Sequence, residues 1–203
     1  MAEGIDGHGA PIRRTGQVQV RAEAGALLVY YIGVELGGYH DALAWARRTE
    51  AVVERLGELA VLEAMSLSDS VGRVHAARGE LAEAAAALQR AEALALRTHG
   101  GDHPATSSTR LALGQVWMRS GRYAEAAAAL QQARAGYARA LGPDHPEITP
   151  VFMVEAELAE ERGDDARAEA LLQQALARRE AEFGPEHTRV VAPLNALGRL
   201  YSR

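Results

Sequence analysis

The chain has 203 residues, of which 48% are hydrophobic, 5% aromatic and 24% charged, and its formal net charge is −5 at pH 7. That length allows one globular domain or a short array of repeats, and an acidic chain lacks the broadly basic surface that nucleic-acid-binding proteins need. The absence of cysteine excludes disulfides, thiolate metal sites and a cysteine nucleophile. Ala dominates the apolar residues, which favours closely packed helices over strands.

Residues 1–17 are rich in Gly and polar residues, so we expect a disordered leader there. The leader lacks the apolar centre of a secretory signal peptide. The longest apolar stretch, ALLVYYIGV at 26–34, is too short to span a bilayer. We therefore expect a cytoplasmic protein with neither a membrane nor a nucleic acid as its partner.

A repeat of 42 residues organises the rest of the chain. Gly79, Gly121 and Gly163 are 42 residues apart. The stretches that begin at these glycines match one another: GELAEAAAALQRA, GRYAEAAAALQQA and GDDARAEALLQQA. Apolar residues on either side of each Gly recur at spacings of three and four, the pattern of a helix with one buried face. Because Gly adopts the left-handed conformation that ends a helix, each unit is predicted to be an antiparallel helical hairpin.

The predicted all-α chain then divides as follows. After the leader comes a divergent first hairpin at 18–60, in which GGYHDALAWA supplies the turn but the linker after it differs from the others. Three regular hairpins follow at about 61–102, 103–144 and 145–186, and a partial unit occupies 187–203. Three interpretations of this last unit remain open. It caps the array, it is the first part of a repeat in a longer protein that was cut there, or it presents an apolar stripe to another chain, formed by Val190, Leu194, Leu197 and Tyr201.

Three histidines in the linkers between units could suggest chemistry, since His145 follows Asp144 in LGPDHPEI and His103 and His187 lie one repeat away on either side. Equivalent positions of stacked helices are separated by roughly 8–10 Å, too far for a shared metal with bonds of about 2 Å. In the local interpretation Asp144 or His145 caps the next helix, whose first position suits Pro146. We expect neither a metal nor any other cofactor.

The hairpins resemble the tetratricopeptide repeat, and the 42-residue period with LGPDHP linkers is similar to the kinesin-light-chain type of that repeat. The resemblance covers about residues 62–203. The residues that carry it most clearly are Leu113, Gly114, Trp117, Gly121, Tyr123, Ala126, Leu130 and Ala133. It implies a right-handed superhelical solenoid of stacked antiparallel hairpins, with a concave groove lined by the first helix of each hairpin.

Residues of that groove can be predicted by counting in steps of 42. One column comprises Arg73, Gln115, Glu157 and Arg199, with Tyr31 one further step upstream. A second column includes Asp69 and Asn195, with Leu111 and Met153 between them, and a third contributes Arg119 and Glu161. The resemblance implies a non-enzymatic scaffold or adaptor that binds a protein or peptide in this groove. Only Asn195 matches the asparagines that recur in the family's groove, so no particular ligand is implied.

Two alternatives to a peptide-binding scaffold remain. The chain could be a structural subunit that forms homo-oligomers through its C-terminal helix, or a regulatory module of a neighbouring enzyme. Catalysis by the chain itself is not expected, because it has no Gly-rich phosphate loop, no HExxH and no nucleophile elbow.

The acidic stretch EAELAEERGDD, 155–165, is either a solvated helix face or a site for an Arg-rich peptide. Glu155 falls where the repeat has an apolar residue. Either the helix is locally rotated there, or a carboxylate is buried with a partner.

Overall fold

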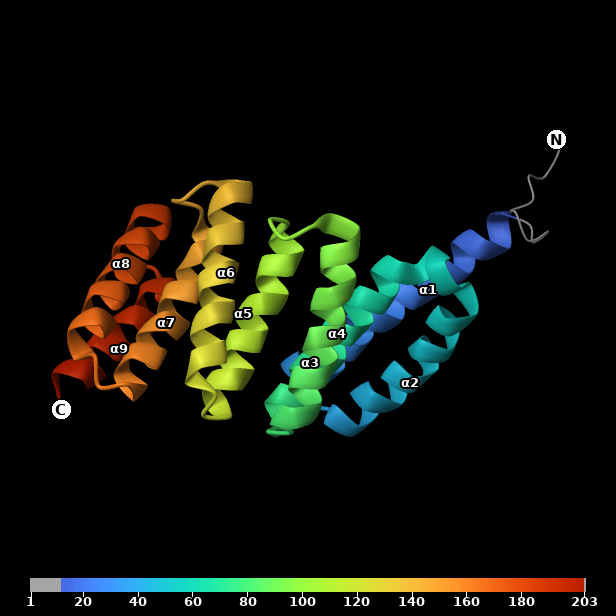
Figure 1. Ribbon diagram of the computed structural model, residues 1–203, viewed down its shortest axis with the longest axis horizontal. Helices are drawn as coiled ribbons and strands as arrows, with labels where there is room; N and C mark the ends of the chain where they lie inside the picture. Colours follow the sequence, from blue (N-terminus) through green and yellow to red (C-terminus); the bar gives the residue numbers. More distant parts are fainter. Residues whose placement is uncertain (1–11, 203) are drawn as a thin grey trace. The chain divides into compact units, whose positions relative to one another are not determined.

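The computed structural model describes residues 12–202, and these form helices and connecting turns without any strand (Figure 1). The expectation of an all-α fold is confirmed for the described residues. The chain divides into two compact units, Met1–Gly100 and Gly101–Arg203. The first unit thus combines the divergent hairpin with the first regular one, a grouping that the repeat pattern does not predict.

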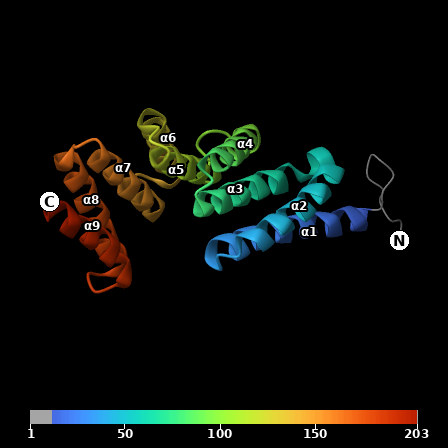
Figure 2. The same ribbon diagram turned by 90° about the horizontal axis from the view of Figure 1, so that it is seen from below.

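Unit 1 contains four long helices. They are α1 (Ile12–Tyr30), α2 (Tyr39–Leu56), α3 (Val61–Arg78) and α4 (Leu81–His99), with a π-helical turn η1 (Tyr31–Glu35) after α1 and a 3₁₀ turn η2 (Gly57–Ala60) after α2. α1 packs against both α2 and α3, and the three lie side by side (Figure 2). Their shared core uses small and branched side chains such as Ala26, Val29, Ala42, Leu67 and Val74, so the helices approach closely.

The start of α1 corrects the predicted leader. The helix begins at Ile12, so the last six residues of the predicted leader, 12–17, are helical. Most of the glycines of the segment lie before residue 10, and Gly16 is the only glycine among residues 12–17. The rest of the predicted leader, residues 1–11, lies outside the described residues.

Unit 2 contains the two other regular hairpins and a final helix. The first hairpin is α5 (Pro104–Arg119) with α6 (Tyr123–Leu141), and the second is α7 (Thr149–Glu161) with α8 (Asp165–Phe183). Short 3₁₀ turns, η3 (Pro146–Ile148) and η4 (Thr188–Val190), precede α7 and α9 (Val191–Tyr201). One core runs through the unit and includes Leu130, Tyr137, Phe152, Leu172 and Leu200.

The glycine turns inside the hairpins have the predicted conformation. Gly79, Gly121 and Gly163 have φ angles of 84°, 73° and 73°. At Gly121, the amide of the next residue, Arg122, donates to the Trp117 carbonyl at 2.8 Å, which satisfies a carbonyl at the end of α5. The glycines that recur every 42 residues therefore mark the ends of the first helices of the hairpins.

The linker histidines cap the elements that follow them. The Nδ1 atoms of His103, His145 and His187 each accept a hydrogen bond from the backbone amide two residues on, at 3.1, 3.3 and 3.1 Å. Each histidine has the extended backbone of an N-cap residue. His145 is thus the cap rather than Asp144, whose carboxylate instead pairs with Arg178 at 3.2 Å.

The predicted apolar stripe on the C-terminal helix is divided between the core and the surface. Val190 and Leu197 are buried, whereas Leu194 and Tyr201 are 46% and 64% exposed. The stripe divides because α9 turns one face toward α8, so residues at different helical angles meet different surroundings. Of these four side chains, only Leu194 and Tyr201 remain on the surface, where another chain could contact them.

Candidate functional site

Six of the nine predicted groove residues lie on the first helices of unit 2. They are Gln115 and Arg119 on α5, Glu157 and Glu161 on α7, and Asn195 and Arg199 on α9. All six are exposed, while neighbours such as Leu113, Val116 and Leu158 are buried. Because residues four apart share a helix face, each helix presents one pair of polar side chains to solvent.

Two glutamates of these helices interact with side chains of neighbouring helices. The Tyr123 hydroxyl donates to the Glu161 carboxylate at 3.1 Å, and this bond raises the pKa of Tyr123. Desolvation raises the pKa of Glu157, nearby Glu160 raises it further, and Arg199 on α9 opposes the rise. Glu157 and Arg199, predicted as members of one column, are therefore electrostatic neighbours.

The other three predicted residues lie in unit 1. Asp69 and Arg73 are one turn apart on α3 and form an ion pair, with Arg73 Nε 2.6 Å from Asp69 Oδ2. Tyr31 begins the π-helical turn η1, which packs against α3, and its side chain is 56% exposed. Leu111 and Met153, the apolar members of the second column, pack partly against the core of unit 2.

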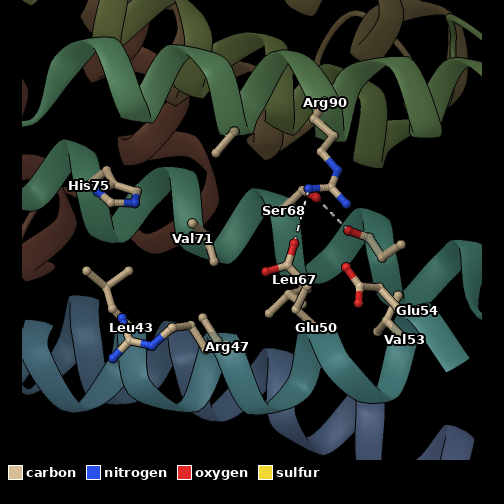
Figure 3. Close-up of a pocket in the computed structure, with 13 residues that line it drawn as sticks. Leu43, Arg47, Glu50, Val53, Glu54, Leu67, Ser68, Val71, His75 and Arg90 are labelled. Carbon is tan, nitrogen blue, oxygen red and sulfur yellow. Dashed lines mark hydrogen bonds and ion pairs between the residues drawn. The ribbon is translucent and has the colours of Figure 1, made fainter.

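A pocket that the sequence did not predict lies between α2, α3 and α4 of unit 1 (Figure 3). Its volume is about 280 Å³, and apolar side chains including Leu43, Val53, Leu67 and Val71 form much of its wall. Its rim is charged: Arg90 Nη1 lies 3.3 Å from Glu50 Oε1, and Glu54 points toward the same arginine. His75 stands at the other end, with Nδ1 2.6 Å from Glu80 Oε2. Such a pocket can accept an apolar side chain flanked by charged groups.

Unit 2 has a pocket at the corresponding place in its repeat. It lies between α6, α7 and α8. Several of its lining residues are 84 positions, or two repeats, after lining residues of the unit 1 pocket. The equivalent pairs are Leu43 and Ala127, Arg47 and Gln131, Glu50 and Arg134, and Val71 and Glu155. Both pockets could therefore have been predicted from the sequence by comparing equivalent residues of the repeats on the side away from the predicted groove columns. Buried Glu155 also resolves the alternative left open by the sequence, because it lies on a continuous helix with Arg134 as its partner.

No group of three or more His, Asp or Glu residues that could hold a metal ion occurs among residues 12–202. Within the same range, no helix is long and apolar enough to cross a membrane.

Paired antiparallel helices, a glycine turn in each regular hairpin and a histidine cap after each regular hairpin define a helical-hairpin repeat protein. A family model described as tetratricopeptide repeat matches residues 62–139 and 113–181, which together span more than half of the chain. The chain belongs to the tetratricopeptide-repeat family. A search of curated proteins finds no match.

Solved structures show the same fold. A crystal structure of a putative kinesin light chain with nearly identical TPR-like repeats from Podosopora anserina is 20% identical, with a TM-score of 0.67, and covers 93% of this chain and 87% of that one. Its Q17M form has a TM-score of 0.69 at the same identity and coverage. BtubC (BKLC) from P. vanneervenii is 14% identical, with a TM-score of 0.66, over 94% of this chain and 82% of that one. The fold is thus that of the kinesin-light-chain-like type of repeat, as the sequence predicted.

Proposed function

We propose that the chain is a non-enzymatic scaffold that binds a protein or peptide partner through the first helices of its repeats. The supporting observation is that α5, α7 and α9 each expose a pair of polar residues, and that equivalent members of these pairs are separated by whole repeats. A ladder of polar groups at regular spacing can hydrogen-bond to an extended peptide and set its register. The mixed charge of Arg119, Glu157, Glu161 and Arg199 favours a partner that carries both signs of charge.

The test begins with a displayed library of random peptides selected on the full chain. A selected peptide is then titrated by calorimetry against a triple variant, Gln115→Ala with Glu157→Ala and Arg199→Ala. We expect its affinity to fall by about tenfold or more, which corresponds to about 1.4 kcal/mol. The matched control replaces the same residue types on the second helices: Gln132→Ala, Glu180→Ala and Arg139→Ala. These residues are exposed as well, and the control should bind as the unmodified chain does.

Equal loss of affinity in both triple variants would place binding outside the first-helix face. Circular dichroism of each variant establishes that the helices are intact before the affinities are compared. Three substitutions at exposed positions are expected to change stability little.

A second candidate function is self-association through α9. Val191, Leu194 and Tyr201 are 48%, 46% and 64% exposed, which is unusual for large apolar side chains on one short helix. Tyr201 is also held in place, since its hydroxyl donates to Glu169 Oε1 on α8 at 2.6 Å. Light scattering over a range of concentrations tests this candidate. A mass that stays at one chain throughout would remove it, while a rising mass that Leu194→Ser abolishes would establish it.

A further inference from the structure

A carboxylate occupies an apolar position of the repeat in unit 2. Val71, Leu113, Glu155 and Leu197 follow one another at intervals of 42 residues. Leu113 and Leu197 are 0% and 8% exposed, and Val71 packs against the core of unit 1. Glu155 is only 6% exposed, so α7 places an ionisable group where the other units place an aliphatic side chain. Such a substitution has a cost in stability that simple packing does not require.

The residue facing Glu155 also departs from the repeat. Arg134 on α6 takes the position held by Glu50 and Glu92 in the two preceding hairpins. Its Nη1 lies 3.3 Å from Glu155 Oε2, but that oxygen receives no hydrogen bond within the described chain. The Arg134 side chain is 41% exposed and lies over the Phe152 ring, 5.9 Å from its centroid. The buried carboxylate therefore has a charge nearby and still needs a hydrogen-bond donor.

Glu155 lines the open pocket between α6, α7 and α8, which has a volume of about 510 Å³. This volume falls within the range of about 300–1,000 Å³ typical of small-molecule pockets. Two charged residues at its edge are already engaged: Arg162 donates to the Tyr123 carbonyl at 2.7 Å, and Asp164 caps α8 by accepting from the Arg167 amide.

Polar groups of both signs face the rest of this pocket. They are the Glu155 carboxylate, the guanidinium groups of Arg134 and Arg167, and the Gln131 amide. Burial raises the pKa of Glu155, while Arg134 and Arg167 lower it, so both arginines act on this carboxylate. A simple anion would meet the negative charge of Glu155, and a simple cation would meet the two arginines. A fitting ligand presents a donor and an acceptor of opposite charge on neighbouring atoms, because Arg134 Nη1 and Glu155 Oε2 are only 3.3 Å apart.

We propose that this pocket binds the zwitterionic head of a free amino acid. The ammonium group donates to the Glu155 carboxylate, and the carboxylate of the ligand accepts from the guanidinium groups of Arg134 and Arg167. Ala127, Leu158 and Ala159 supply an apolar part of the wall, so the ligand carries an apolar side chain. A peptide does not fit the pocket in this way, because its terminal ammonium and terminal carboxylate are separated along the chain. The scaffold would then carry a small-molecule site on the side of the repeat away from the predicted groove columns.

The first experiment titrates the full chain with L-leucine by calorimetry and compares two analogues. N-acetyl-L-leucine lacks the ammonium group, and L-leucinamide lacks the carboxylate. We expect one L-leucine to bind per chain and both analogues to bind at least tenfold more weakly. Failure of L-leucine to bind, or equal binding of either analogue, would overturn the proposal, and neither result requires a variant.

The second experiment repeats the titration with Glu155→Gln, which keeps the shape of the side chain and removes its charge. We expect L-leucine affinity to fall at least tenfold. The matched control is Glu180→Gln at an exposed position of α8 outside the pocket, which should leave the affinity unchanged. Wild-type affinity in Glu155→Gln would also refute the proposal. Because the peptide-binding test uses other residues and another ligand, failure of either proposal leaves the other standing.

Discussion

Replacing Glu155 by leucine should stabilise unit 2, because it restores the residue type that the repeat has at Leu113 and Leu197. Glu155 is 6% exposed, and its Oε2 lacks a hydrogen bond; an unsatisfied buried acceptor costs about 1–3 kcal/mol. Burying a leucine side chain in its place contributes about 1.5–3 kcal/mol. The lost attraction to partly exposed Arg134 and the strain of fitting a branched side chain offset part of this gain. We expect the free energy of unfolding to rise by about 1–3 kcal/mol, in the range seen when buried ion pairs are replaced by apolar residues.

The measurement is urea-induced unfolding at neutral pH, monitored by tryptophan fluorescence. The chain has two tryptophans, Trp45 in unit 1 and Trp117 in unit 2. In a Trp45→Phe background, Trp117 reports on unit 2 alone. Glu157→Leu on the exposed face of α7 is the control and should change the free energy by less than about 0.5 kcal/mol. A lower free energy of unfolding in Glu155→Leu would refute the reasoning, since it would show that the carboxylate stabilises the fold as it stands.

Three further predictions concern packing, capping and pH. A Cβ at Gly114 would lie 2.7 Å from Leu130 Cδ2, whereas a Cβ at Gly198, two repeats further on, would meet nothing within 4 Å. Gly198→Ala should gain about 0.5–1 kcal/mol from helix propensity. Urea unfolding should therefore show that Gly114→Ala is about 1–3 kcal/mol less stable than Gly198→Ala. The change His145→Ala removes the side-chain acceptor at the start of η3 and should lower stability by about 1 kcal/mol without altering peptide affinity, as calorimetry would show. Burial raises the pKa of Glu155, so the folded state binds this proton more tightly than the unfolded chain does; relative to Glu155→Gln, the wild-type free energy of unfolding should be highest below about pH 4 and fall as pH rises above that value. Equal stability of the two glycine variants, weaker peptide binding in a fully stable His145→Ala, or a flat pH difference would each contradict the corresponding argument.

The hairpins and their boundaries could be predicted from sequence because their determinants are local. A Gly at the end of a first helix adopts a positive φ wherever it occurs, and a linker His caps the element that begins beside it. Gln115, Glu157 and Arg199, which the same period makes equivalent, are all exposed, since exposure follows from helical angle once the buried face is known. Which partner these residues bind does not follow from the period.

The amino-acid sequence alone therefore determined the fold class, the repeat register and the family. Only the tertiary structure showed that Glu155 is buried rather than turned to solvent. It also showed that Arg134 from the preceding helix lies beside Glu155. It also revealed the pockets between helices and divided the apolar stripe of α9 between core and surface. The physical reason is the same in each case: turns and caps depend on residues a few positions apart, whereas burial and pockets depend on side chains that packing brings together from separate helices.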